Sequence, residues 1–204
     1  MSGPTVALVD SGGTNIGSVS YALERLGARA ALTSDPVTIL AADRVVLPGV
    51  GAAGAGMARL QDSGLVDVLH RVGQPLLGVC LGMQLLFDSS EEDGGVDCLG
   101  LLPGTVVHIP ATAEARVPHM GWNALEVLRP DPLLAGIATG ERAYFVHSYA
   151  VPVGPTTIAA TWHGGDWSAV VRQGHRWGAQ FHPERSADVG ARLLRNFLAE
   201  VSDD

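Results

Sequence analysis

The sequence predicts an α/β fold with a mixed, mainly parallel central sheet flanked by helices, and an additional antiparallel sheet region. In the first half, continuous apolar strand-like runs alternate with helical segments, which is typical of a parallel sheet covered on both faces. In the second half, short strands separated by Gly, Pro and polar turns indicate antiparallel or mixed pairing. No linker or repeat divides the 204 residues, so we expect a single domain, 1–204.

Short apolar runs that end in turn-forming residues define the strands of the first half. They are expected at 5–9, 28–33, 44–47 and 76–79. Between them, apolar residues at helical spacing predict a helix over 16–26 that stops at Gly27. One or two further helices are expected before residue 72, and another over 81–88.

The second half is expected to contribute the additional strands and a closing helix. The strands are predicted at 105–107, 124–127, 143–146, 157–160, 168–171 and 177–181. The helix is predicted over 187–199, because its apolar residues Val189, Leu193, Leu194 and Phe197 share one side.

Charge and cysteine content restrict the class of protein. The formal net charge is −8, from 13 basic and 21 acidic residues, which argues against binding to nucleic acid or to an anionic membrane surface. No apolar stretch approaches the length of a membrane span. Cys80 and Cys98 form no CxxC pair and no secretory signal is evident, so we expect a cytoplasmic protein with reduced thiols.

Cys80 lies between two glycines in the segment Gly78-Val79-Cys80-Leu81-Gly82. The predicted strand before it and the predicted helix after it give this segment the form of a nucleophile elbow with Cys in place of Ser. In such an elbow the nucleophile lies at a strained apex, and the helix N-terminus favours a thiolate. Cys80 is therefore the candidate nucleophile, with a buried structural cysteine as the alternative.

A thiolate nucleophile needs a base, and the base needs a group that orients it. His182 follows a predicted strand, and Pro183 favours an extended backbone at His182. Residues i and i+2 of an extended chain point the same way, so Glu184 is expected to reach one ring nitrogen and leave the other for Cys80.

An oxyanion hole for this nucleophile is expected from two loops. The backbone N–H of Leu81 follows the nucleophile, and the Pro48–Gly51 loop follows the neighbouring third strand. Val50 or Gly51 is the candidate second donor.

A dinucleotide-binding protein is the alternative from a different class. Gly49-Val50-Gly51-Ala52-Ala53-Gly54 matches G-x-G-x-x-G after a strand, but the acidic residue expected about 20 positions later is missing. No cluster has metal-ligand spacing, and we expect neither a metal nor a cofactor.

The motifs "GVCLGMQLL" and "QFHPE" closely resemble those of the class I, or triad, glutamine amidotransferases. Within that family, "PHMGWN" and Met83 are most similar to the glutaminase subunits of imidazole glycerol phosphate synthase. The resemblance implies a flavodoxin-like fold and hydrolysis of L-glutamine through a thioester on Cys80, with His182 as base and acid and Glu184 as its orienter. It further implies substrate contacts from Gly49, Gln84, His147, Ser148 and Tyr149.

The resemblance also implies a partner, a (β/α)₈-barrel cyclase subunit that receives the ammonia in a heterodimer of histidine biosynthesis. Met120, Trp122, Asn123 and Arg185 are the expected interface residues. Two features depart from the family pattern: Arg185 stands where Lys is common, and "DSGGTN" leaves the role of residues 11–15 open.

Several functional alternatives remain compatible with the sequence. Within the class, the runner-up is a triad glutaminase of another pathway, such as anthranilate synthesis. Outside it are a free-standing hydrolase or peptidase and a binding module that has lost catalysis. The intact Cys80, His182 and Glu184 argue against the last of these.

Overall fold

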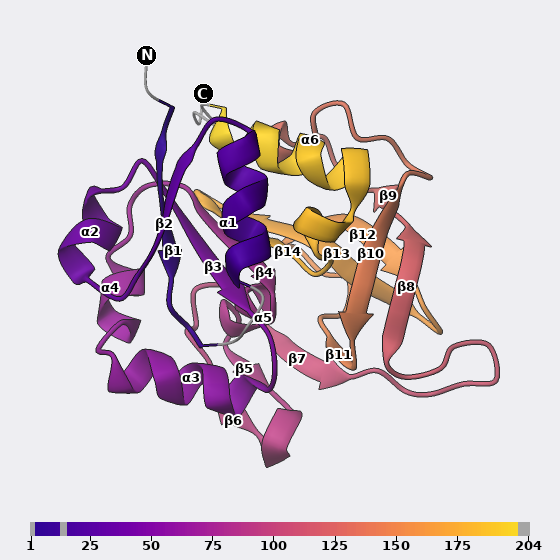
Figure 1. Ribbon diagram of the computed structural model, residues 1–204. Coiled ribbons are helices and arrows are strands. Elements are labelled where there is room, and N and C mark those ends of the chain that lie inside the picture. Colours follow the sequence, from indigo (N-terminus) through magenta and orange to yellow (C-terminus); the bar gives the residue numbers. More distant parts are fainter. Residues whose placement is uncertain (1–2, 13–15, 200–204) are drawn as a thin grey trace.

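The structure, a computed structural model (Figure 1), describes residues 3–12 and 16–199. Its helices are α1 (Ile16–Arg25), α2 (Pro36–Ala41), α3 (Ala53–Asp62), α4 (Val66–His70), α5 (Leu81–Leu85) and α6 (Ala187–Leu198), with 3₁₀ turns η1 (Glu92–Gly94), η2 (Pro132–Leu134) and η3 (Pro183–Arg185). Among the described residues, none of these helices has both the length and the apolar character needed to cross a bilayer.

A large mixed sheet forms the centre of the molecule and has the order β2-β1-β3-β4-β14-β13-β12-β9. Its parallel part consists of β2 (Arg29–Thr33), β1 (Thr5–Val9), β3 (Arg44–Gly49), β4 (Leu76–Cys80) and β14 (Arg176–Ala179). The sheet continues in antiparallel pairing through β13 (Asp166–Gln173), β12 (Thr157–Trp162) and β9 (Glu126–Val127).

Two smaller sheets lie beside the central one (Figure 1). One is the antiparallel pair β8 (His119–Ala124) and β10 (Arg142–His147). The other joins β11 (Tyr149–Ala150), β7 (Thr105–His108), β5 (Ser89–Ser90) and β6 (Val96–Asp97). These sheets confirm the predicted mixed fold with an additional antiparallel region.

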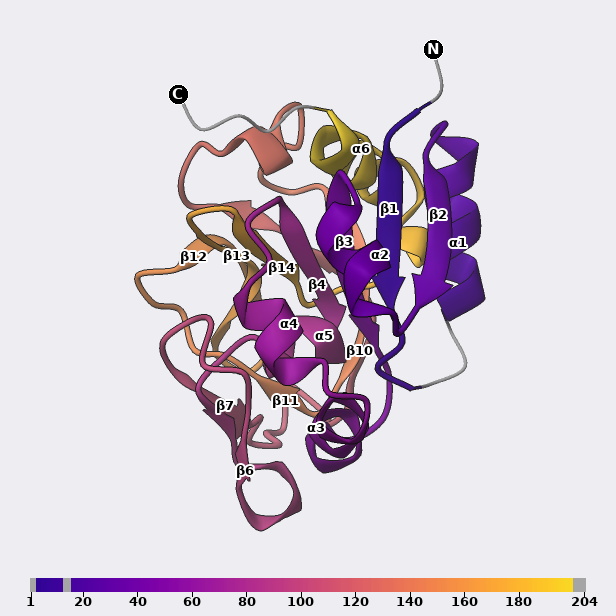
Figure 2. The ribbon, with the colours of Figure 1, turned by 90° about the vertical axis from the view of Figure 1, so that its left-hand side faces the viewer.

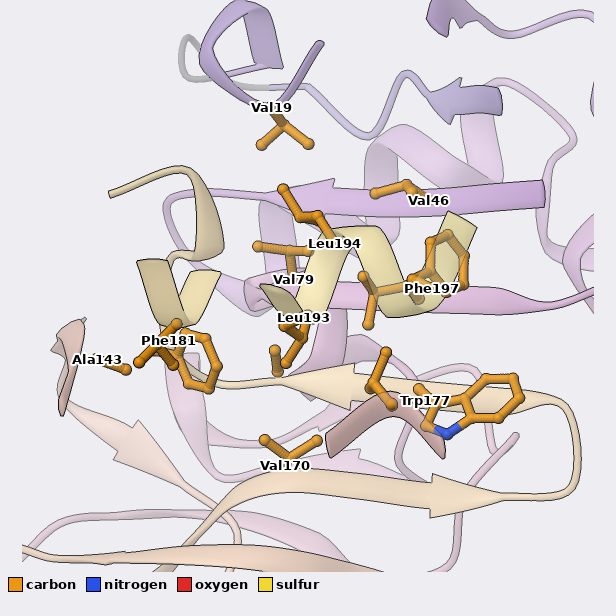
Figure 3. Packing of buried hydrophobic residues seen from close by; sticks show 14 of the residues in the cluster. Val19, Val46, Val79, Ala143, Val170, Trp177, Phe181, Leu193, Leu194 and Phe197 are labelled. Atoms are coloured by element: carbon orange, nitrogen blue, oxygen red, sulfur yellow. The ribbon is translucent and has the colours of Figure 1, made fainter. Parts of the chain in front are cut away.

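Both faces of the central sheet are covered, as the continuous apolar strands predict. Helices α1 and α6 lie on one face of the sheet, and α2, α3, α4 and α5 lie on the other (Figure 2). Apolar side chains of the two groups belong to two separate buried clusters. Leu193, Leu194 and Phe197 of α6 lie over the strands that carry Val79 and Trp177 (Figure 3). Burying an apolar side chain of this size contributes about 1.5–3 kcal/mol, so these faces hold the sheet rigid beneath the loops at its carboxyl edge.

The carboxyl ends of β3 and β4 meet at one edge of the sheet. Gly49, at the end of β3, pairs in register with Cys80, at the end of β4. Val79 pairs with Ala179 near the end of β14, three residues before His182. The topology thus brings the predicted nucleophile, its predicted base and the glycine loop to one edge, which is where ligands bind in open α/β sheets.

Some predicted elements were wrong in detail. The predicted strand 124–127 contains a break: β8 ends at Ala124 and β9 starts at Glu126, because Leu125 donates its N–H to Glu141 O instead of continuing the β8–β10 ladder. The helix predicted over 81–88 ends at Leu85, because Leu86 turns and accepts hydrogen bonds from Leu101 and Leu102.

Candidate active site

Cys80 occupies the strained apex that the sequence predicts. It joins β4 directly to α5 with φ 54° and ψ −113°, a backbone conformation that costs a non-glycine residue about 1–3 kcal/mol. Cys80 is 7% exposed. The elbow geometry is confirmed, and Cys80 lies where the buried apolar cluster meets the pocket described below.

The two bracketing glycines are required by close backbone packing. A Cβ at Gly78 would lie 2.6 Å from the carbonyl oxygen of Gly82, and a Cβ at Gly82 would lie 1.8 Å from that of Leu47. A third glycine belongs to the same junction, since a Cβ at Gly49 would lie 2.8 Å from the Gly82 nitrogen. These contacts let β3, β4 and α5 meet closely enough to hold Cys80 at its apex.

His182 and Glu184 form the predicted pair, but through a backbone conformation other than the predicted one. His182 is extended (φ −94°, ψ 100°), but Glu184 lies in the 3₁₀ turn η3, so the proposed i, i+2 extended geometry was wrong. The turn still places Glu184 Oε1 2.9 Å from His182 Nδ1. The backbone of His182 is fixed because its N–H donates to Tyr144 O and its carbonyl accepts from Ser186 Oγ.

The protonated form of His182 is favoured. Burial opposes the charged ring, but hydrogen bonds with Cys80 and Glu184, and the charges of these groups, raise the pKa of His182 to about 10. Because Nδ1 is bonded to Glu184, Nε2 is the ring nitrogen left for Cys80. A cationic imidazole between a carboxylate and a sulfur atom is the arrangement that activates a cysteine nucleophile.

Replacing Glu184 by glutamine is expected to lower the pKa of His182 below that of the wild type. A neutral amide removes the negative charge that stabilises the imidazolium, so the ring will lose its proton at lower pH. A ring-nitrogen NMR titration measures this midpoint. As a control, Glu141→Gln removes a half-buried carboxylate that pairs with Arg192 and should leave the His182 midpoint in place. Equal midpoints in Glu184→Gln and wild type would contradict the assigned pairing.

A pocket of about 340 Å³ opens beside Cys80, within the usual range of about 300–1,000 Å³ for small-molecule sites. It brings together most of the predicted site residues. Its lining includes Cys80, His182, Val50, Gly51, Leu81, Gln84, His147, Ser148 and Tyr149. Glu184 is behind His182, and Gly49 lines a small neighbouring cavity with Gly12, Val19 and Val79 instead of this pocket.

The glycine-rich loop that suggested a dinucleotide-binding protein lies beside the cysteine elbow. It connects β3 to α3, and two of its residues, Val50 and Gly51, line the pocket beside Cys80. Gly51 has φ +96°, a conformation available mainly to glycine.

Glu92 and Pro118 also line the pocket and were missed from the sequence. Glu92 Oε2 accepts a hydrogen bond of 2.7 Å from the Ala53 N–H at the start of α3. Glu92 stands in the acidic run Glu91-Glu92-Asp93, which reads as an ordinary solvated turn. Only the packing of this turn against α3 reveals that the side chain faces a site.

The predicted interface residues divide into two groups. Met120 and Trp122 are 63% and 50% exposed, and the Arg185 guanidinium stacks 4.5 Å over the ring of Tyr144, which contacts Trp122 edge-on. Met120, Trp122, Tyr144 and Arg185 thus form one surface, which we call the aromatic patch. Asn123 points the other way, and its side chain makes hydrogen bonds within the chain.

Ser11 lies close to the glycine loop. Its buried hydroxyl donates to the carbonyl of Pro48 at 2.5 Å, so it ties the end of β1 to the start of that loop. Of the segment whose role the sequence left open, residues 13–15 lie outside the described residues.

The mixed sheet with a cysteine elbow at its carboxyl edge is the arrangement expected of an amidotransferase, and the comparison with known families agrees on the family. Residues 7–201 match the family model of glutamine amidotransferase class-I. The chain belongs to this family.

Two relatives within the family carry the same name. The chain is 58% identical over 193 residues to the imidazole glycerol phosphate synthase subunit HisH of Xanthomonas campestris pv. campestris (strain 8004), covering 95% of this chain and 96% of that one. It is equally similar to the subunit of the same name from Xylella fastidiosa (strain Temecula1 / ATCC 700964), with 58% identity over 95% of this chain and 96% of that one.

Solved structures support the fold. A crystal structure of a glutamine amidotransferase has a TM-score of 0.72 at 22% identity, over 95% of this chain and 96% of that one. A chain in the structure of PurLQS from Thermotoga maritima has a TM-score of 0.71 at 18% identity, over 98% of this chain and 100% of that one.

Proposed function

We propose that this chain is the glutaminase subunit of an imidazole glycerol phosphate synthase, which releases ammonia from L-glutamine for a cyclase partner. The observation that carries the chemistry is Cys80 at its strained apex, beside a His182 ring whose other nitrogen is bonded to Glu184. The similarity to HisH subunits over nearly the whole chain supports the choice of pathway.

The reaction proceeds through a thioester. The Cys80 thiolate attacks the side-chain amide carbon of glutamine, and the His182 imidazolium donates its proton to the departing nitrogen, which leaves as ammonia. The neutral imidazole then takes a proton from water, whose oxygen attacks the thioester carbon. The carbon–sulfur bond breaks and glutamate leaves, with the thiolate and imidazolium restored.

The negative charge on the carbonyl oxygen needs hydrogen-bond donors in each half of this cycle. The N–H of Leu81 is one proposed donor, and the N–H of Val50 or Gly51 is the other. Losing one such donor costs about 10²–10³ in rate, so a movement of the Pro48–Gly51 loop would be enough to switch the activity. We propose that hydrolysis stays slow until the partner orients this loop.

The polar groups of the pocket suit an amino acid. Glu92 places a carboxylate in the pocket that would attract the α-ammonium group of glutamine. Gln84 donates both hydrogens of its amide, to Tyr149 O and Gln180 Oε1. Gln84 therefore has only its carbonyl oxygen left, which would accept a hydrogen bond from an N–H of the substrate.

The proposed partner is a (β/α)₈-barrel cyclase that forms a heterodimer with this chain. Ammonia released into water would be protonated and lose its nucleophilicity, so a docked consumer is needed. The aromatic patch offers a tryptophan and an arginine, two residue types enriched where partners dock. Both cysteines are free thiols, consistent with a cytoplasmic location.

The test measures glutamate release by the purified chain, alone and with a barrel cyclase and its ribonucleotide substrate. We expect slow glutamate release by the chain alone. With the cyclase and its substrate the rate should rise about 10²–10³-fold, which is the effect of one oxyanion-hole donor on the rate. A high rate of glutamate release that does not depend on the cyclase would indicate a glutaminase of another pathway or a free-standing hydrolase. Absence of release in both conditions would contradict the proposed function.

A further inference from the structure

A chain of hydrogen bonds between side chains runs from the inner face of β8 to the wall of the pocket. Asn123 Nδ2 lies 3.1 Å from His119 Nε2, and His119 Nδ1 lies 3.0 Å from His147 Nε2. His147 Nδ1 lies 2.8 Å from the carbonyl oxygen of Tyr149. His119 and His147 are 3% and 7% exposed, so these bonds are shielded from solvent.

Chemistry fixes the direction of every bond in this chain. The Tyr149 carbonyl can only accept, so Nδ1 of His147 carries a hydrogen. Burial and the charges of neighbouring histidines lower the pKa of His147 to about 4, although its hydrogen bond to Tyr149 O acts in the other direction. Burial, together with His147 and His163, lowers the pKa of His119 to about 3. Both rings are therefore neutral at pH 7, with one hydrogen each.

With one hydrogen on each ring, the remaining assignments follow. Nε2 of His147 must accept, so Nδ1 of His119 donates to it. Nε2 of His119 must then accept from Asn123 Nδ2. The orientation of the Asn123 amide agrees, because Nδ2 also donates to Trp162 O and Oδ1 accepts from the N–H of Ala124. The chain donates in one direction, from β8 towards the pocket.

The chain ends on an oxygen atom that also holds Gln84. The Tyr149 carbonyl accepts from His147 Nδ1 and from Gln84 Nε2, both at 2.8 Å. Its two lone pairs are thus filled. The second hydrogen of Gln84 Nε2 goes to Gln180 Oε1 at 3.0 Å. A shift of the His147 ring would therefore move the anchor that sets which end of the Gln84 amide faces the pocket.

The middle ring of the chain is clamped on both faces. His119 stacks against Phe145 at 4.7 Å between ring centroids and against His163 at 4.0 Å, with interplanar angles of 17° and 16°. His119 has little freedom to tilt between these two rings. The site therefore contains a pre-ordered support that lies beyond the groups lining the pocket.

We propose that His119 and Asn123 are positioning residues for the substrate, which act through His147 and the Tyr149 carbonyl to hold the Gln84 amide in its binding orientation. This inference rests on the proposed function for the identity of the substrate. It assigns to Asn123 a role in this hydrogen-bond network, in place of the role at the partner interface that the resemblance implies.

The test compares steady-state glutaminase kinetics of His119→Leu and His119→Asn in the complex with the cyclase. Leucine removes the donor, and the KM for glutamine should rise about tenfold, the size of one hydrogen bond, while kcat changes less than about twofold. Asparagine can place an N–H near the position of Nδ1 and should restore the KM to within about threefold of the wild type. Asn123→Ala, which changes a less buried position, should raise the KM about threefold.

A matched control distinguishes positioning from general destabilisation. His175 also donates to a backbone carbonyl, that of Val72, but at the opposite end of β4 and β14. His175→Leu should leave the KM for glutamine unchanged even if the melting temperature falls. An unchanged KM in His119→Leu, or equal KM values for His119→Leu and His119→Asn, would overturn the proposal.

Ring-nitrogen NMR of the wild-type chain provides a readout that does not depend on activity. We expect both His119 and His147 to be neutral at pH 7 with the hydrogen on Nδ1, the less common form of a free histidine. A hydrogen on Nε2 of either ring would overturn the proposal. If the wild-type complex releases no glutamate, the proposed function fails, and this spectrum still decides whether the chain of donors exists.

Discussion

Cys80→Ala is expected to abolish glutamine hydrolysis, with kcat lower by at least about 10⁴-fold. Loss of the nucleophile of a triad removes the covalent route and leaves only binding and the oxyanion hole, and losses of about 10⁶ are known for such changes. The substitution removes only a sulfur atom. Alanine meets the same backbone strain at φ 54° as cysteine does, so the fold should be retained. Glutamate release by the complex with the cyclase measures the effect.

Two controls make this result specific. Ammonium salts should still support the cyclase reaction in the Cys80→Ala complex, because the partner then receives its ammonia from solution. Cys98→Ala should hydrolyse glutamine like the wild type. Burial, with Asp97 and Glu92 nearby, raises the pKa of the Cys98 thiol to about 11, so Cys98 remains an unreactive thiol. Substantial glutamate release by Cys80→Ala would contradict the thioester mechanism.

The end of the sheet that carries the candidate catalytic residues could be predicted from the sequence because its signals are local. The Gly78–Gly82 bracket, the apolar run before it and the pattern of His182, Pro183 and Glu184 lie in two short segments. The glycines permit the sharp strand-to-helix junction at Cys80, and Pro183 favours an extended backbone at His182. The parallel pairing of β3, β4 and β14 then brings the two segments together.

The walls of the pocket could not be predicted in the same way, because they depend on contacts distant in sequence. Glu92 becomes a pocket residue only when η1 packs against α3. His119 becomes a ring in a donor chain only when β8 pairs with β10, which places His119 opposite His147. Of β8, only the last residue, Ala124, was predicted from the sequence. In His119-Met120-Gly121-Trp122-Asn123 the two apolar residues are the exposed ones and His119 is buried, which is the reverse of the pattern that marks a half-buried strand.

Glu184, the glutamate of the proposed triad, illustrates a prediction that reached the correct contact for an incorrect reason. An extended chain would place His182 and Glu184 on the same side through period-two alternation. The chain instead turns at Pro183 into η3, and the carboxylate returns to Nδ1 from that turn. Proline at the first position of a helical turn is common because its missing N–H is not needed there, so the sequence was compatible with both geometries.

Gly82→Ala is expected to destabilise the protein by more than about 4 kcal/mol, or to prevent folding, because it overpacks a backbone junction. The new Cβ would lie 1.8 Å from the carbonyl oxygen of Leu47. Leu47 belongs to β3, which is paired on one side with β1 and on the other with β4, so β3 cannot move away without breaking the central sheet. Urea unfolding measures the loss.

Gly73→Ala is the matched control for this substitution. Nothing lies within 4 Å of a Cβ at Gly73, so alanine should leave stability unchanged or raise it by about 0.4–1 kcal/mol through the lower entropy of the unfolded chain. Any Gly82→Ala protein that does fold should also lose glutaminase activity, because a displaced α5 moves the Leu81 N–H away from the oxyanion. A Gly82→Ala protein that matched Gly73→Ala in stability would show that β3 and α5 can separate, and the close glycine junction would then not be what holds Cys80 at its apex.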